Sequence, residues 1–353
     1  MKIAIIGAGN GGQAMAGHFG YLGHEVRLYS RNLEKLKKII YNKGVLLKEK
    51  LNGLGRVDVV TDEMAVAVQG AELIMVTTVA NAHATIAYQL APLLEEGQTI
   101  VLNPGRTFGA LEFRTIIEQY SSKKVYIAET QSLLYACRAE GNGEVRIIGV
   151  KDKLPVAAYP SKDTDVVLEN LTQLSNSFIK ATNIFETSLE NIGCIFHPAI
   201  VLFNAATIER GDSFYFYSDM TPSIASFIEA IDKERLAIGE KLNVKLLSVF
   251  DWISFSYKEV TGDTLYERMM NNPAYYKIMA PNFLNSRLLT EDIPTGVLPL
   301  IEIAQLLDIK TPLLTSVYNV TAELLKTDFR KTGRTLKNLG LDNIDIIDLI
   351  NCV

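Results

Sequence analysis

Three glycines near the start of the chain restrict its fold more than any other feature. They are spaced as Gly-x-Gly-x-x-Gly, directly after the apolar run Ile3–Ile6 and before helix-favouring residues. This pattern is typical of a dinucleotide-binding turn, in which glycines allow a tight turn, close approach of a pyrophosphate and close packing of helix on strand. The helix N-terminus then binds the phosphates. The alternative is a glycine-rich turn of some other α/β protein. The residues expected to bind the dinucleotide are Gly7, Gly9, Asn10, Gly11 and Gly12.

Strand-like and helix-like segments alternate over residues 1 to about 150. Because such alternation produces a mostly parallel sheet with helices on both faces, we expect an α/β Rossmann-type doubly wound domain. A ligand then binds at the carboxyl ends of the strands, near the point where the strand order reverses. Strands are expected at Ile3–Ile6, Glu25–Tyr29, Val57–Val60, Leu73–Thr77, Thr99–Leu102 and Lys124–Ala128, and helices at Asn32–Tyr41, Asn81–Leu94 and Leu111–Tyr120.

The segment after residue 145 predicts a transition to a second domain. Its expected elements are strands at Val145–Val150 and Pro155–Tyr159, added antiparallel at a sheet edge, a helix at Asp165–Phe178 and a strand at Ala181–Phe185. Ser188, followed by Leu-Glu-Asn, is typical of a helix N-cap with an acidic first turn. We therefore place a dinucleotide-binding domain at 1–187 and a mostly α-helical domain at 188–353, with loops around Gly211, Gly262, Asn271–Pro273 and Pro294–Gly296.

The composition is that of a globular protein large enough for two domains. Of 353 residues, 48% are hydrophobic and 21% are charged, so a sizeable core can be buried. The net charge of −5 argues against nucleic acid or an anionic membrane as a partner. Cys137, Cys194 and Cys352 have neither the spacing of metal ligands nor that of a disulfide framework. Since no signal peptide or membrane-length apolar run is present, we expect a soluble cytoplasmic protein without a metal.

The end of the second expected strand bears on the choice of cofactor. NAD-binding proteins usually place an acidic residue there for the ribose 2′-hydroxyl, whereas this chain has Ser30 and Arg31. Arg31 can stack on adenine and pair with a 2′-phosphate, so the pattern favours NADP, with NAD as the alternative. Arg31 can equally be a solvated charge at a strand end. Thr78, after the fourth expected strand, is expected to border the nicotinamide ribose.

Four histidines are candidates for acid–base chemistry: His18, His24, His83 and His197. The first two fall within the first strand–helix–strand unit, where structural roles are expected, and His83 starts a helix near the predicted crevice. His197 lies among apolar residues and precedes Pro198, which removes a backbone donor and can kink a helix. On the residues alone, a packed core histidine is favoured there over a catalytic one.

A polar cluster occupies residues 285–296. It contains an arginine, two acids, a proline and a glycine within ten residues: Arg287, Glu291, Asp292, Pro294 and Gly296. The Arg287 guanidinium suits bidentate binding of a substrate carboxylate, and Asp292 can orient an imidazole that acts as a general base. The alternative is a capped loop with an ordinary surface ion pair.

Several of these segments together resemble the octopine/nopaline (opine) dehydrogenase family. The resemblance covers most of the chain, and the helical part is also similar to the C-terminal domain of 6-phosphogluconate dehydrogenase. The segments that carry it are Gly-Ala-Gly-Asn-Gly-Gly at 7–12, Ala-Glu-Thr-Gln-Ser-Leu-Leu-Tyr-Ala-Cys-Arg at 128–138, Asn191…His197-Pro198…Asn204, and Arg287-x-x-x-Glu291-Asp292-Ile-Pro294.

The resemblance implies an NADH- or NADPH-dependent enzyme. Such an enzyme condenses the amino group of an amino acid with a 2-oxo acid and reduces the imine by hydride transfer. The resemblance also implies that His197 is the acid–base group, Asp292 its partner and Arg287 the clamp for the 2-oxo-acid carboxylate. Thr130 and Arg106 take substrate-facing positions. The expected partners are these two small molecules, and a homodimer through the helical domain stays open.

Other enzymes share this domain organisation. Ketopantoate reductase and glycerol-3-phosphate dehydrogenase use a lysine at the base of the second domain, but Ser188–Asn204 contains no lysine and offers His197. A 2-hydroxy-acid or alcohol dehydrogenase that uses histidine stays open as the alternative enzyme. A non-catalytic NADP-binding sensor would keep the glycine turn and lose the set of His197, Asp292 and Arg287, which is present here.

Overall fold

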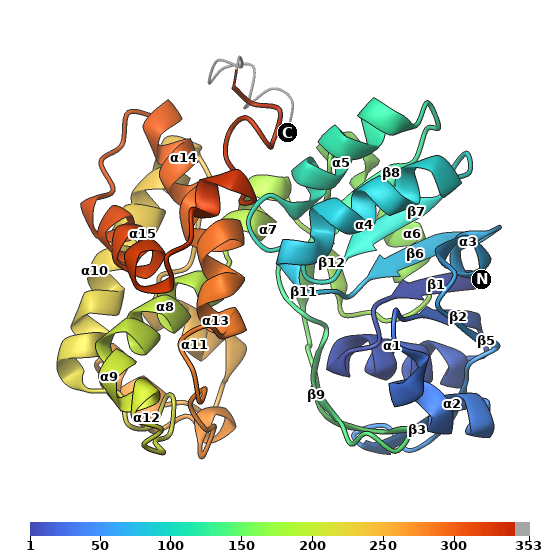
Figure 1. Cartoon of the computed structure of the whole chain (residues 1–353), viewed down its shortest axis with the longest axis horizontal. Coiled ribbons are helices and arrows are strands. Elements are labelled where there is room, and N and C mark those ends of the chain that lie inside the picture. Colours follow the sequence, from blue (N-terminus) through green and yellow to red (C-terminus); the bar gives the residue numbers. More distant parts are fainter. Residues whose placement is uncertain (343–353) are drawn as a thin grey trace. The chain divides into compact units, whose positions relative to one another are not determined.

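The computed structural model describes residues 1–342; residues 343–353, which include Cys352, lie outside the described part. The chain divides into two compact units after Ser188 (Figure 1). The first unit contains two β-sheets with their helices, and the second is built from helices.

An eight-stranded sheet forms the centre of the first unit. Its order is β12–β11–β8–β7–β6–β1–β2–β5, and all neighbouring pairs are parallel except β8 with β11. All residues of β6 and β7 are buried, as central parallel strands require. The predicted α/β fold is confirmed. The strands are β1 (Lys2–Ile6), β2 (Glu25–Tyr29), β5 (Val59–Thr61), β6 (Leu73–Val76), β7 (Thr99–Leu102), β8 (Tyr126–Thr130), β11 (Leu154–Ala158) and β12 (Phe178–Lys180).

Crossover helices between parallel strands create the expected switch point in the strand order. α1 (Asn10–Tyr21) leads from β1 outward to β2, whereas α4 (His83–Leu90) and α5 (Gly109–Tyr120) lead in the opposite direction, from β6 through β7 to β8. Right-handed connections therefore place α1 on one face and the adjoining α4 and α5 on the other (Figure 1). The carboxyl ends of β1 and β6 flank this switch point, where such sheets bind ligands. The other helices are α2 (Lys37–Asn42), α3 (Met64–Val68), α6 (Thr164–Leu171) and α7 (Ile184–Leu189).

A four-stranded sheet, absent from the expected elements, packs against α1. Its order is β4–β3–β10–β9, formed by β3 (Gly44–Glu49), β4 (Gly53–Arg56), β9 (Tyr135–Ala139) and β10 (Glu144–Val150). Glycines allow the close approach. A Cβ at Gly20 would lie 1.9 Å from Arg56 O, and one at Gly55 would lie 1.7 Å from Gly17 O. Larger residues at these positions would separate the sheet from α1.

The chain between residues 145 and 185 differs from its predicted elements. Residues 145–150 belong to the four-stranded sheet, and β11 is antiparallel to β8 but is not an edge strand, because β12 pairs with it. The helix predicted for Asp165–Phe178 ends at Leu171, because buried Phe178 pairs with Leu154 in the sheet. Residues 181–183 are irregular and α7 begins at Ile184, so the predicted strand is also wrong. In this segment, pairing with distant strands determines the secondary structure, and the local sequence pattern does not.

Ser188 lies within α7 and does not cap the next helix. Its hydroxyl hydrogen-bonds to Glu129, a fully buried residue of β8, and accepts from Phe108 N at 2.9 Å. The same carboxylate accepts from Thr187 Oγ1 and from Ala110 N, both at 2.8 Å. A buried carboxylate needs several donors, and Ser188 serves as one of them. The predicted N-cap is therefore wrong.

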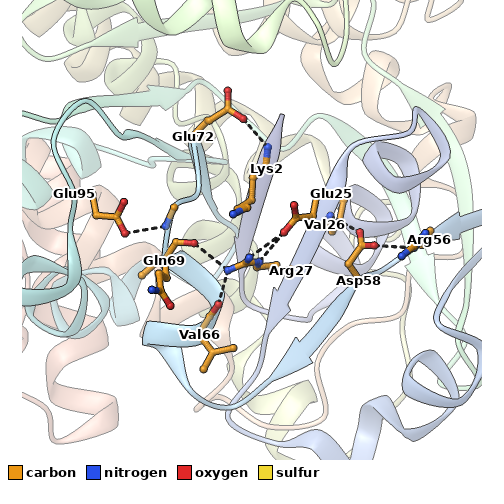
Figure 2. Close-up of polar contacts among 12 residues, drawn as sticks. Lys2, Glu25, Val26, Arg27, Arg56, Asp58, Val66, Gln69, Glu72 and Glu95 are labelled. Atoms are coloured by element: carbon orange, nitrogen blue, oxygen red, sulfur yellow. Dashed lines mark hydrogen bonds and ion pairs between the residues drawn. The ribbon is translucent and has the colours of Figure 1, made fainter.

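Arg27 of β2 ties the strand to the end of α3 (Figure 2). Its Nη1 donates to Val66 O at 2.9 Å and Gln69 O at 3.0 Å, and its Nη2 lies 2.9 Å from Glu25 Oε1. An arginine satisfies the last carbonyls of a helix in this way. This network lies at the amino ends of the strands, the edge opposite to the switch-point crevice.

The second unit is helical, as predicted. α8 packs against α10, α13, α15 and η6, so its apolar sequence is largely buried. Among the helices of residues 1–342, none is both long and apolar enough to cross a membrane. The helices are α8 (Gly193–Phe203), α9 (Ala205–Glu209), α10 (Pro222–Lys241), α11 (Val249–Ser256), α12 (Leu265–Met270), α13 (Arg287–Thr290), the π-turn η6 (Ile293–Val297), α14 (Leu298–Leu306) and α15 (Pro312–Leu325).

Candidate active site

His197 lies in the middle of α8 and is held by Asp292. Its Nδ1 is 2.6 Å from Asp292 Oδ2, and the two side chains are 16% and 3% exposed. Because a carboxylate only accepts hydrogen bonds, Nδ1 carries the hydrogen and Nε2 is the nitrogen left for chemistry. The structure thus brings together the two residues predicted to form an acid–base pair.

A π-helical turn places Asp292 opposite His197. η6 begins directly after Asp292, where a loop around Pro294–Gly296 was predicted, so that prediction is wrong. Gly296 permits close packing on α8, since a Cβ there would lie 2.4 Å from Cys194 Cβ. Pro294 stands in the first turn, where no backbone N–H is required. The proline and glycine that indicated a loop are the residues that allow this turn.

The other imidazole nitrogen faces Tyr217. Tyr217 Oη lies 3.0 Å from His197 Nε2. The tyrosine belongs to an irregular segment that Phe216 N fixes to Ile278 O at 2.7 Å. Both nitrogens of His197 therefore have a partner within the helical unit.

Aromatic rings surround Tyr217. Its ring stacks on Tyr275, with centroids 4.2 Å apart and planes 21° from parallel, and meets Phe216 edge-on at 4.8 Å. Tyr275 in turn meets Tyr257 at 5.3 Å. Burial raises the pKa of Tyr275 well above its usual value and also raises the pKa of Tyr257, so both phenols are neutral near neutral pH. These aromatic side chains therefore give His197 an uncharged surrounding on this side.

Arg287 opens α13, five residues before Asp292. Its side chain is 68% exposed, and its Nη1 lies 3.9 Å from Oε2 of the buried Glu291. At that distance the ion pair is loose, and the exposed guanidinium still offers donors to a ligand. This arrangement suits the binding of a carboxylate.

The glycine turn after β1 is tight at its ends and open in the middle. Gly7 has a φ of +109°, a Cβ at Gly12 would lie 1.8 Å from Gly7 O, and one at Gly11 would lie 2.8 Å from Leu133 Cδ1. In contrast, apart from Gly9 and its two chain neighbours, no atom of residues 1–342 lies within 4 Å of the position that a Cβ on Gly9 would take. This space, next to the N-terminus of α1, fits a phosphate bound by backbone N–H groups.

Polar atoms after the neighbouring strands also fit a ligand. The Thr78 hydroxyl, Asn103 Nδ2 and the Ser132 hydroxyl are buried without a hydrogen-bond partner among the described residues. They follow β6, β7 and β8, at the carboxyl edge of the sheet. Because buried polar groups are normally paired, such atoms at the crevice fit a polar ligand such as nicotinamide and its ribose.

The other predicted cofactor residues differ in their contacts. Arg31 is exposed, and within residues 1–342 its side chain makes no ion pair. Ser30 Oγ donates to Asn32 O at 3.3 Å. Asn10 Oδ1 accepts from Ala139 N at 3.0 Å, so this side chain joins the glycine turn to β9. Arg31 is thus the side chain most available to a cofactor.

Thr130 and Arg106, predicted to face substrate, lie after neighbouring strands. Thr130 ends β8, is 1% exposed, and donates its hydroxyl to Ser132 O at 2.8 Å and Leu102 O at 3.3 Å. Arg106 is half-buried in the turn after β7, with a φ of +60°, beside the cis peptide Asn103–Pro104. The Thr130 hydroxyl thus donates to the backbone, and the substrate-facing positions of Thr130 and Arg106 stay predictions.

The remaining histidines have structural contacts. His18 Nδ1 is 2.7 Å from Tyr135 Oη, and burial, followed by nearby His24, lowers the pKa of His18 to about 4. His24 Nδ1 lies 3.3 Å from the N-terminal amino group. His83 is fully buried and meets Phe113 edge-on at 5.7 Å.

Comparisons with known proteins identify the family of this chain. A family model described as NAD/NADP octopine/nopaline dehydrogenase, alpha-helical domain, matches residues 180–325, and one described as NADP oxidoreductase coenzyme F420-dependent matches residues 2–102. The opine dehydrogenase of Arthrobacter sp. (strain 1C) is 37% identical over 344 residues, which cover 97% of this chain and 95% of that protein. This chain belongs to the opine dehydrogenase family.

Solved structures show the fold of the opine dehydrogenase family in more distant relatives. Octopine dehydrogenase with NADH and L-arginine matches with a TM-score of 0.81 at 21% identity, covering 96% of each chain. Yersinopine dehydrogenase with NADP⁺ bound matches with a TM-score of 0.75 at 14% identity, covering 99% of this chain and 96% of that one. The predicted resemblance to the opine dehydrogenase family is therefore confirmed.

The hydrogen bond from Tyr217 to His197 was not predicted from the sequence of this opine dehydrogenase family member. Tyr217 stands in the aromatic run Phe214–Tyr217, and such runs belong to a core more often than to a site. The available signal was its hydroxyl, because a partly buried tyrosine usually hydrogen-bonds through its polar end. The partner, His197, could not be identified from spacing.

Proposed function

We propose that this chain is an NAD(P)H-dependent opine dehydrogenase, which condenses the amino group of an amine with a 2-oxo acid and reduces the C=N bond. The observation that carries the proposal is the 2.6 Å pair of His197 and Asp292, with Arg287 exposed on the adjoining turn, in a chain of this family. This arrangement supplies an oriented acid–base group and a carboxylate ligand together.

Each group has a chemical role that its geometry supports. Forming the C–N bond requires a proton to leave the ammonium group and another to reach the departing hydroxyl, and a histidine can do both near neutral pH. Asp292 keeps the hydrogen on Nδ1, and Arg287 binds the carboxylate of the 2-oxo acid. A reduced nicotinamide bound at the glycine turn supplies the hydride.

Oxidation of NADPH and NADH by the purified protein, followed by absorbance, tests this function. The substrate panel begins with pyruvate and L-arginine or agmatine, because octopine dehydrogenase has been solved with each of these, and continues with other 2-oxo acids and amino acids. We expect oxidation only when both substrates are present. Oxidation with a 2-oxo acid alone would indicate a hydroxy-acid dehydrogenase, and cofactor binding without turnover would indicate a sensor.

We further propose that NADPH is the preferred cofactor. The support is the exposed Arg31 after β2, together with the lack of a carboxylate at residues 30–32. Arg31→Ala should weaken NADPH binding by about tenfold, or about 1.4 kcal/mol, and NADH binding much less, because only NADPH carries the 2′-phosphate whereas both cofactors carry the adenine. Fluorescence titration measures both affinities, with the exposed Lys50→Ala as control. Equal affinities of Arg31→Ala and the parent for NADPH would contradict this preference.

A further inference from the structure

Both nitrogens of His197 are occupied by side chains of the protein. Asp292 Oδ2 lies 2.6 Å from Nδ1, and Tyr217 Oη lies 3.0 Å from Nε2. Each ring nitrogen makes one in-plane hydrogen bond. A substrate proton therefore reaches Nε2 only through Oη, or after the tyrosine side chain has moved away.

The packing of Tyr217 opposes such a movement. Its ring is stacked on Tyr275 and held edge-on by Phe216. Two backbone hydrogen bonds fix the segment on either side of Tyr215. Phe216 N donates to Ile278 O at 2.7 Å, and Ala280 N donates to Phe214 O at 3.0 Å. Rotating the ring away would break the ring contacts as well as the bond to Nε2. This favours transfer through Oη.

The polarity of the hydrogen bonds also suits a transfer. Because the Asp292 carboxylate accepts from Nδ1–H, the neutral imidazole has its lone pair at Nε2 and accepts the Tyr217 hydroxyl. A phenolic oxygen that donates its hydrogen to Nε2 can itself accept a proton, and Tyr217 is only partly buried. The three groups thus form a continuous hydrogen-bonded chain from Asp292 through His197 to Tyr217.

We propose that Tyr217 exchanges the proton with the substrate and passes it to and from His197 along the chain Asp292–His197–Tyr217. This inference rests on the proposed function. It makes Tyr217 a catalytic residue and assigns His197 the role of storing the proton beside Asp292.

The proton transfers balance over the whole formation of the C=N bond. The substrate ammonium gives a proton to Oη while the phenolic proton passes to Nε2, so His197 becomes a cation facing Asp292. The amine nitrogen then bonds to the keto carbon, and the oxygen of the adduct becomes a hydroxyl by taking a proton from that nitrogen. When the C–O bond breaks, Oη gives a proton to this hydroxyl, which leaves as water, and Nε2 returns its proton to Oη. Tyr217 and His197 end as they began.

Tyr217→Phe tests the proposal because it keeps the stacked ring and removes only Oη. We expect kcat for the condensation to fall by about 100-fold, while the KM values of both substrates and the affinity for NADPH stay within about twofold. Tyr215→Phe is the matched control: it removes a hydroxyl two residues away, from a residue that forms a β-bridge with Met279, and should keep the parent kcat.

A second measurement examines the resting protein without substrates. In ¹⁵N-histidine NMR spectra, the Nε2 signal of His197 should move in Tyr217→Phe and stay in place in Tyr215→Phe. A parent-like kcat in Tyr217→Phe, an unchanged Nε2 signal, or a loss confined to KM would each overturn the role of Tyr217 and leave the proposed function standing. Absence of turnover by the parent protein with every substrate pair would overturn both.

Discussion

Asp292 acts on His197 through its charge as well as its position. An asparagine could keep a contact with Nδ1 but can turn an N–H toward it, which would favour the opposite tautomer. The imidazole hydrogen would then sit on Nε2, and the lone pair that accepts a proton there would be lost. The carboxylate therefore sets which nitrogen of His197 carries the hydrogen, and in the proposed mechanism the other nitrogen is the base.

We expect Asp292→Asn to lower kcat/KM by about 100-fold or more, because the acid–base step loses its oriented imidazole. Steady-state kinetics with the substrate pair that the panel identifies measures this change. Asp212→Asn is the control, since Asp212 forms an exposed ion pair with Arg210 and should leave kcat/KM unchanged. If Asp292→Asn were as active as the parent, the pairing at 2.6 Å would have no catalytic role.

Single residues of the site were predictable to different degrees. His197 and Asp292 could be singled out only through the family resemblance, because on its own an apolar stretch with one histidine indicates a core. Tyr217 could not be paired with His197, because the contact depends on how an irregular segment folds back. Residue type indicates what chemistry is available, whereas three-dimensional packing decides which groups meet.

At the scale of elements, the glycine turn combines two kinds of glycine. Gly12 is required by packing, since a Cβ there would lie 1.8 Å from Gly7 O. Gly9 has a φ of −73° and open space around it, so the folded chain alone does not require a glycine at that position. We expect a ligand to come close to the backbone at this glycine.

Gly9→Ala and Gly12→Ala should therefore differ in their effects. Gly9→Ala should weaken NADPH binding by about tenfold or more, with the free energy of unfolding changed by less than about 0.5 kcal/mol. Gly12→Ala should lower the free energy of unfolding by about 3 kcal/mol or more, because the backbone must shift. Fluorescence titration and urea unfolding measure the two quantities. Gly149→Ala, whose Cβ would meet only Ala136 at 3.9 Å, is the control; a Gly9→Ala protein with parent affinity would remove the phosphate from this turn.

The sequence pattern predicted those elements whose formation depends mainly on their own residues. β7 has the predicted bounds because a short, fully buried parallel strand is a nearly continuous apolar run. β2 also has the predicted bounds, with the more exposed Glu25 and Arg27 alternating with the buried Val26 and Leu28. β3, β4 and β9 were missed, since each depends on partners far along the chain or on the glycine-lined face of α1. η6 was missed because Pro294 and Gly296 normally indicate a loop, whereas here they allow a helical turn to pack on α8.

At the scale of the whole molecule, the free energy of unfolding depends on pH through His18, which is buried in its uncharged form. His18 is 8% exposed, and burial lowers its pKa from 6.5 to about 4. The unfolded chain binds a proton at His18 below about pH 6.5, whereas the folded chain does so only below about pH 4. Between these values the unfolded state binds more protons, so the free energy of unfolding decreases as the pH falls.

We expect His18→Gln to remove this pH dependence. The two pKa values of His18 correspond to about 3 kcal/mol of stability that is present near pH 7 and lost by about pH 4. Urea unfolding at a series of pH values measures this loss. Between about pH 7 and pH 4, the free energy of unfolding of the parent should fall by up to about 3 kcal/mol more than that of His18→Gln. Parallel curves for the two proteins would show that His18 ionises equally easily in both states.

A ribosome synthesises β3 long before the strands that complete its sheet, since β3 starts at Gly44 and β9 starts at Tyr135. At about 5–20 residues per second, β9 and β10 emerge several seconds after β3 and β4. During that interval the nascent chain exposes the unpaired edge of β3, together with the apolar side chains Val45 and Leu47 that the finished protein buries. Products of translation that stop before residue 144 keep this edge exposed. Because an unpaired strand edge can pair with another chain, we expect such products to aggregate more readily than the complete chain.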